Sequence, residues 1–167
     1  MKKETRKLKE ELNVPWITKD GYLDLEKIPI DGILKQTLSE DFDKFRSGCG
    51  ILQGMHNHRR IEAGIYLLGL LQHYRNDLER LVIIVEKLWV FKTTACADAL
   101  FSELWRVKSS NTTRRYINTV IKTLSHFPYE MVGEQFECLA KDTSFSYRMR
   151  KKFSDILENM RYRALGY

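Results

Sequence analysis

From Arg59 onward the sequence repeats one pattern, in which amphipathic stretches of helical length alternate with short polar turns. Apolar residues within each stretch recur three and four positions apart, which predicts helices with one buried face. Because the turns are only a few residues long, successive helices should pack as antiparallel neighbours. We therefore expect an all-α fold of stacked helical hairpins. The stretches begin near Arg59, Leu78, Thr94, Asn111, Tyr129 and Tyr147.

Individual apolar positions indicate which helix faces are buried. The first helix should bury Ile61, Ile65, Leu68 and Leu71. The second, at 78–91, is apolar on nearly all sides and is the expected centre of the core. The next two carry their own apolar stripes and end near Trp105 and before Pro128, and the last two are expected at 129–141 and 147–160.

The N-terminal third has a different pattern. Asp20-Gly21 stands between two short β-prone runs, which favours a tight hairpin turn. A helix is expected over residues 33–45, ending where Gly48 and Gly50 punctuate the chain. We thus expect residues 1–56 to form an arm, a small hairpin and a first helix that pack on a repeat region at 57–167, the whole being one domain.

Two segments are internally similar. The run 99–124 has an apolar helix, a polar turn and a helix opening with Arg114-Arg115, and 136–157 repeats this scheme about 35 residues later. His58-Arg59-Arg60 would begin the second helix of an earlier unit. This layout resembles HEAT-like (armadillo-type) repeats, whose second helix typically begins with an arginine after a short polar turn. The resemblance covers about residues 57–160 and implies a right-handed α-α superhelix.

Composition and charge narrow the class of protein. The 167 residues are 43% hydrophobic and 30% charged, which excludes disordered and low-complexity classes. The net charge of +6 lies entirely after residue 56. An odd set of three cysteines argues against a disulfide scaffold. The sequence shows neither a secretory signal nor an apolar run of membrane-spanning length, so a cytoplasmic protein without a membrane partner is expected.

Cations recur at the start of the second helix of each unit, where the helix dipole disfavours them unless an anion is near. The anion could be an internal carboxylate of a ladder between stacked repeats, or an external phosphate or acidic partner. The stretch between Glu103 and Glu130 contains no acid, so neutralisation is hardest there. The predicted binding face consists of Arg114, Arg115, Asn118, Lys122, Arg148, Lys151 and Lys152. A plain solvated surface is the alternative.

Other candidate sites are weak. His56 and His58 could share a divalent ion, but no cysteine or carboxylate follows at ligand spacing. Asp20 to Lys27 imitates part of a calcium loop without its first and last ligands. Cys49 is expected to be inert, and Cys96 and Cys138 to be core residues. We expect no catalytic residue, metal or cofactor.

These observations favour a non-catalytic module that binds a protein partner through its basic face, to which an acidic partner would be complementary. Nucleic-acid binding through the same residues is the alternative, and it would weaken steeply with salt. A hydrolase or DNA-repair enzyme on a HEAT-like scaffold would need an exposed acid in an aromatic-lined groove, and the sequence shows no unambiguous one. The oligomeric state stays open.

Overall fold

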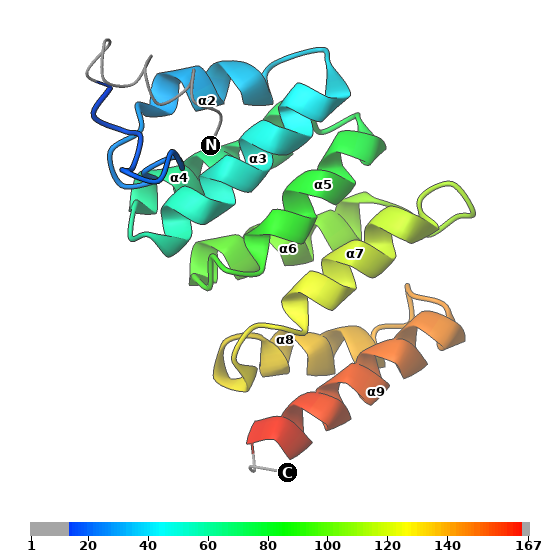
Figure 1. Cartoon of the computed structure of the whole chain (residues 1–167). Coiled ribbons are helices and arrows are strands. Elements are labelled where there is room, and N and C mark those ends of the chain that lie inside the picture. The colour runs from blue at the N-terminus through cyan, green and yellow to red at the C-terminus, as the bar shows by residue number, and fades with distance from the viewer. Residues whose placement is uncertain (1–13, 165–167) are drawn as a thin grey trace. The chain divides into compact units, whose positions relative to one another are not determined.

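The structure is a computed structural model that describes residues 14–164 (Figure 1). All of its regular elements in that range are α-helices, which confirms the all-α fold class. They are α2 (Ile30–Thr37), α3 (Phe42–Asn57), α4 (Ile61–His73), α5 (Leu78–Leu88), α6 (Thr94–Arg106), α7 (Arg114–Leu124), α8 (Tyr129–Lys141) and α9 (Tyr147–Ala164).

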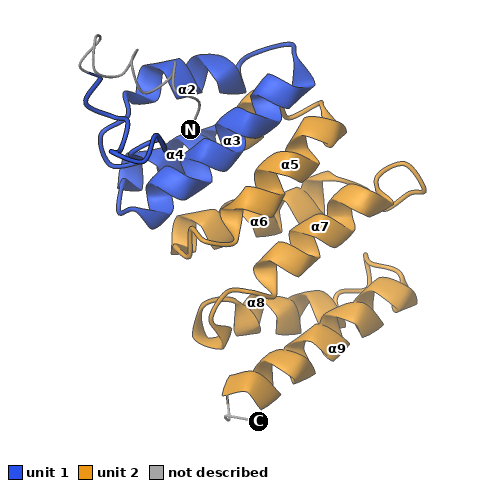
Figure 2. Cartoon of the chain, in the orientation of Figure 1, with its two compact units in different colours: residues 1–70 blue, residues 71–167 orange. Residues whose placement is uncertain are grey.

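The chain divides into two compact units, residues 1–70 and 71–167 (Figure 2). The division falls inside the last turn of α4, whereas the sequence pattern pointed to a change of organisation at residue 57. The first unit holds α2, α3 and most of α4, and the second holds α5 to α9.

A short hairpin opens the described part of the first unit. Ile17 and Leu23 form an isolated antiparallel bridge, and Gly21 lies between them with a φ of 86°. That positive φ is the backbone conformation for which a glycine is suited. The turn predicted at Asp20-Gly21 is therefore present, although no full strand forms in residues 14–164.

The helix predicted over residues 33–45 is wrong. The chain forms α2 as far as Thr37 and starts α3 at Phe42, where the carboxylate of Asp41 accepts hydrogen bonds from the Asp43 and Lys44 backbone N–H groups at 3.0 and 3.2 Å. That is an N-cap, which marks a helix start. α3 then continues through both glycines. An added Cβ at Gly48 would lie 2.9 Å from Thr37 Cγ2, so this glycine permits close packing of α2 on α3.

The face of α4 that packs inward also differs from the prediction. Ile61 and Ile65 are 64% and 59% exposed, whereas Ala63 and Leu67 are fully buried. Leu71, which was expected to be buried, is buried. Apolar residues occupy most positions of α4, so periodicity alone fits more than one stripe, and packing selects the face that carries Ala63 and Leu67.

The second unit is a stack of helical hairpins. α6 packs on α7 and α8 on α9, and each pair is joined by a short loop, as the internal similarity predicted. α5 packs on α7, and α6 on α8. The core combines the largely buried α5 with the apolar stripes of the later helices, and Leu81, Ile84, Val85, Leu100, Val120, Phe136 and Phe153 are fully buried.

Helices α5, α7 and α9 lie side by side on one face of the second unit, the face turned to the viewer in Figure 1. The hydroxyl of Thr123 on α7 donates to the Val85 carbonyl of α5 at 3.1 Å. One turn further along both helices, the Trp89 and His126 rings contact each other with centroids 5.9 Å apart. α5 and α7 are therefore parallel, and their carboxyl ends meet.

Candidate functional site

α7 separates an apolar face from a polar one. Ile117, Val120, Ile121 and Leu124 are buried. Arg114, Asn118 and Lys122 are exposed and lie four residues apart, so they follow one another along the opposite face. This is the arrangement that the sequence predicted for the acid-free segment.

A groove of about 840 Å³ lies between α5 and α7, and we call it the α5–α7 groove. Three of its lining cations come from α7, and its aromatic residues are Trp89 and His126. The lining residues are Glu86, Trp89, Asn111, Arg114, Arg115, Asn118, Thr119, Lys122, Thr123 and His126.

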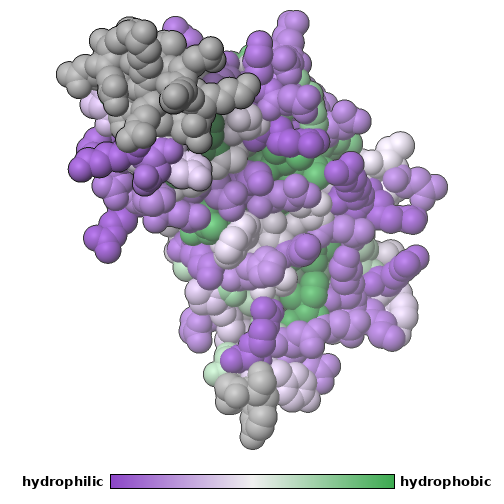
Figure 3. Space-filling view, in the orientation of Figure 1, coloured by the Kyte–Doolittle hydropathy of each residue, from purple (hydrophilic) through white to green (hydrophobic). Residues whose placement is uncertain are grey.

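A second groove, of about 410 Å³, lies between α7 and α9, and we call it the α7–α9 groove. Arg114 and Asn118 line both grooves, so the two adjoin along α7. The second groove adds Arg148, Lys151 and Lys152 from the first turns of α9. All seven residues of the predicted binding face therefore line one of two adjoining grooves. Hydrophilic side chains cover much of this face in Figure 3.

The cations of the two grooves have no carboxylate partner in the part of the chain that the structure describes. Within the described residues, Arg114, Arg115, Lys122, Arg148, Lys151 and Lys152 form no ion pair. The only carboxylates that line the grooves, as far as residues 14–164 go, are Glu86 and Asp155. Neither α7 nor α9 has an acid in its first turn, so cations adjoin the positive ends of both helix dipoles.

Arg106 contrasts with these cations, because it is neutralised. Its guanidinium pairs with Glu103, and the buried Tyr116 hydroxyl donates to the same carboxylate at 2.5 Å. Burial, with the neighbouring Glu103 carboxylate, raises the pKa of Tyr116. The acid-free stretch thus receives one local counterion, and this counterion is directed away from the grooves into the α6–α7 packing.

Lys152 connects the two groups of cations. Its ammonium donates to Asn118 Oδ1 at 2.6 Å, which links α9 to the polar face of α7. Partial burial lowers the pKa of Lys152, and the positive charge of Arg148 lowers it further. Holding this ammonium charged against burial and a like charge costs free energy that a bound anion would reduce.

Sequence reasoning missed the aromatic end of the α5–α7 groove. Trp89 belongs to the apolar stretch at 78–91 that was expected to form the centre of the core, yet it is 43% exposed. Trp89 is the C-cap residue of α5, and it lines the α5–α7 groove. His126, one residue past the C-cap of α7, and the exposed Glu86 complete this end. No motif in the sequence connects these three residues, because they come together only when α5 packs on α7.

Two further cations that the sequence singled out, Arg59 and Arg60, lie in the first unit. Arg60 pairs with Glu62 at 2.8 Å and donates to the Ile28 carbonyl at 2.6 Å, so its partners are internal. The Glu62 partner lies two residues away, not on a stacked repeat. Arg59 is exposed and has a φ of 68° in the turn that ends α3.

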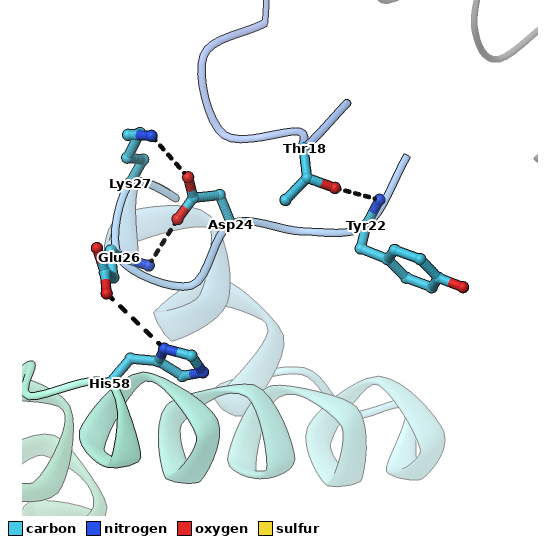
Figure 4. A network of polar contacts seen from close by, with 6 residues as sticks. All are labelled: Thr18, Tyr22, Asp24, Glu26, Lys27 and His58. Carbon is cyan, nitrogen blue, oxygen red and sulfur yellow. Dashed lines mark hydrogen bonds and ion pairs between the residues drawn. The ribbon is translucent and has the colours of Figure 1, made fainter. Parts of the chain in front are cut away.

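The His58 ring and the Asp20 to Lys27 segment belong to one polar network (Figure 4). His58 Nδ1 lies 3.9 Å from the Glu26 carboxylate, and Lys27 pairs with Asp24 at 2.8 Å. The hydrogen bond from Lys27 holds the pKa of Asp24 below its ordinary value. Within residues 14–164, no group of three or more His, Cys, Asp or Glu side chains is arranged to hold a metal ion.

The cysteines differ in exposure. Cys49 and Cys96 are buried, and burial raises the pKa of Cys96 to about 12. Cys138 is exposed, so its prediction as a core residue is wrong. It lies on α8 at a position that turns away from the buried Phe136 and Leu139. Among the described helices, none combines the length and apolar character needed to cross a membrane.

Comparison of the chain with protein-family models, with curated proteins and with solved structures found no significant match.

Proposed function

We propose that the second unit binds nucleic acid through its phosphate backbone, without catalysis. The observation that carries this proposal is a set of six cations that form no ion pair within residues 14–164 and line the two grooves that adjoin at Arg114 and Asn118. Lysine and arginine side chains neutralise phosphates and release the counterions that surround nucleic acid, which supplies most non-specific affinity. Amide and hydroxyl groups such as Asn118 and Thr119 supply the further hydrogen bonds to phosphate.

The composition of the grooves favours nucleic acid over the protein partner that the sequence suggested first. Six cations line them, three of them lysines, whereas the cores of protein–protein interfaces are depleted of charged residues and especially of lysine. Protein–nucleic acid interfaces are more polar and much more positively charged. An acidic protein segment remains the competing ligand, and the experiment below separates the two.

The experiment measures binding of labelled single-stranded and duplex DNA and RNA across a range of salt concentrations. If all six cations contact phosphates, the logarithm of the binding constant for single strands should fall with the logarithm of salt with a slope of about −4. The triple variant Arg114→Gln/Lys122→Gln/Lys151→Gln should reduce the size of that slope by about 2.

The matched control removes three cations outside the grooves. Lys19, Lys35 and Arg75 are exposed and line neither groove. The variant Lys19→Gln/Lys35→Gln/Arg75→Gln should keep the wild-type slope, which separates a localised site from the effect of net charge. Absence of binding at low salt would overturn the proposal. Tighter binding of a poly-glutamate peptide than of any nucleic acid would favour the acidic protein partner instead.

A further inference from the structure

We propose that the aromatic end of the α5–α7 groove, formed by Glu86, Trp89 and His126, binds an unpaired nucleobase, so that the ligand is single-stranded nucleic acid. This inference rests on the proposed function and specifies its ligand. It concerns the part of the groove in which the lining changes from cationic to aromatic and acidic.

The Trp89 indole is available for stacking. It is 43% exposed and lines the groove, and its single described ring contact is with His126, at 5.9 Å between centroids and an interplanar angle of 57°. Because the two rings are tilted, the face of the Trp89 indole can receive a base while the His126 ring lies beside it. Stacking of a base on an aromatic side chain is worth about 1 to 3 kcal/mol and tolerates any base, because every base has a π-face.

Glu86 shows which part of the ligand lies at this end. A carboxylate repels phosphate, so the phosphates should follow Arg114, Asn118 and Lys122 and leave the vicinity of Glu86. A carboxylate does accept hydrogen bonds from the amino groups of bases, such as cytosine N4. Within the described residues, the Glu86 carboxylate has no hydrogen-bond or ion-pair partner, so its acceptor sites are open to a ligand.

The spacing along α7 fits a strand that reaches both ends. Arg114 and Lys122 are eight residues apart, which is about 12 Å along the helix axis. About three nucleotides span that distance at the 3.4 Å rise of a stacked strand. His126 lies one helical turn beyond Lys122, and its ring contacts that of Trp89. A strand whose phosphates contact Arg114 and Lys122 therefore brings its next base to these two rings.

A duplex does not satisfy this end of the groove. Its bases are stacked on each other and present only their edges, so no base face is open to Trp89 until a nucleotide leaves the stack. Unstacking a paired base costs a few kcal/mol, whereas a single strand largely avoids this cost. The aromatic end should therefore discriminate in favour of single strands, while the cations bind both forms.

The test compares a single-stranded oligonucleotide with an abasic strand of the same length, which keeps every phosphate but lacks the bases. Wild-type protein should bind the normal strand about tenfold more tightly, which is the stacking contribution of one base. Trp89→Leu should remove that difference and leave abasic binding and the salt slope unchanged. Trp105→Leu is the matched control, because Trp105 is an exposed tryptophan on α6 that lines neither groove.

Glu86→Gln provides an independent readout. It should tighten binding of the abasic strand, because a charge that repels phosphate is gone, and it should reduce any preference for oligo-dC over oligo-dT. Parallel assays with RNA and DNA strands establish which sugar the site accepts.

The outcomes separate this inference from the proposed function. If wild-type protein binds neither strand, the proposed function itself fails. If it binds the normal and abasic strands equally, or binds duplex more tightly than single strands, phosphate binding stands and the base site is overturned. Loss of the base-dependent affinity in Trp105→Leu, with Trp89→Leu unaffected, would also overturn it.

Discussion

Two glycines of α3, Gly48 and Gly50, are two residues apart and differ in what surrounds them. A Cβ added at Gly48 would lie 2.9 Å from Thr37 Cγ2 and 3.0 Å from the Thr37 backbone nitrogen, whereas a Cβ at Gly50 would meet nothing within 4 Å. Gly48→Ala should therefore force α2 away from α3 and lower the free energy of unfolding by about 1 to 2 kcal/mol. Gly50→Ala should be neutral or raise it by up to about 1 kcal/mol.

Urea unfolding followed by circular dichroism compares these two variants directly. Equal effects of the two substitutions would show that the close approach of α2 and α3 is absent from the folded protein. The pair also isolates packing from helix propensity, because both glycines lie inside the same helix and gain the same methyl group.

Tyr116 gives a prediction of pH dependence. Burial and the Glu103 carboxylate raise its pKa above the ordinary value of 10.0, so the folded protein holds the phenol proton more tightly than the unfolded chain does. The resulting stabilisation is complete below pH 10 and is lost as the pH rises further. Tyr116→Phe should be less stable by about 1 to 2 kcal/mol at neutral pH, since a hydrogen bond to a charged group is lost.

The difference in free energy of unfolding between wild-type protein and Tyr116→Phe should shrink above pH 10. Only the wild type has the phenol proton at this position, and the unfolded chain loses that proton at a lower pH than the folded protein does. Denaturant unfolding at pH 8, 9, 10 and 11 measures this difference. A difference that stays constant over this range would mean that the Tyr116 hydroxyl is not held by Glu103 in the folded state.

At the residue scale, the sequence alone grouped the cations of the proposed site but did not indicate its aromatic end. Arg114, Asn118 and Lys122 share one helix face, so helical spacing alone groups them. Trp89 lies in a run of apolar residues and looks like a core residue, and its exposure depends on the direction in which α5 faces α7. No periodicity in one helix contains that information.

At the scale of one element, α7 combines a cost in stability with the binding role proposed for it. Arg115 is exposed in the first turn of α7, where the positive end of the helix dipole disfavours a cation. Arg115→Glu should therefore raise the free energy of unfolding by about 0.3 to 1 kcal/mol. The same substitution should weaken nucleic-acid binding, because Arg115 lines the α5–α7 groove.

Thermal unfolding and a binding titration on the same preparation test both effects of Arg115→Glu. If Arg115 serves folding and not binding, Arg115→Glu should instead lower the free energy of unfolding and leave the affinity unchanged. Arg115→Gln distinguishes loss of the cation from the added negative charge, since it should produce a smaller change of the same sign in both measurements.

Element boundaries were predictable wherever turns separated amphipathic stretches. The helix predicted at 129–141 is α8, and the predicted starts at Thr94 and Tyr147 are the first residues of α6 and α9. The prediction failed for residues 33–57, where glycines inside a helix resemble a helix end until the packing partner is known. It failed for the face of α4 because nearly every position there is apolar. Membership of the HEAT-like class stays a prediction.

At the scale of the whole molecule, the proposed site lies within one of two compact units, and the cysteines report on both. Cys49 is buried in the first unit and Cys96 in the second, whereas Cys138 is exposed. A thiol reagent should therefore modify Cys138 at once in the folded protein, and the other two only when their surroundings open.

A ligand that binds the grooves of the second unit stabilises the closed state there. At a free ligand concentration of about 100 times Kd the gain is about 2.7 kcal/mol, so labelling of Cys96 should slow about 100-fold while that of Cys138 is unchanged. Mass spectrometry of labelled peptides, with and without a single-stranded oligonucleotide, measures all three rates.

Protection of Cys49 without protection of Cys96 would place the ligand on the first unit and contradict the proposed site. Equal protection of both would mean that the two units unfold together, and protection of Cys96 alone would mean that they open independently.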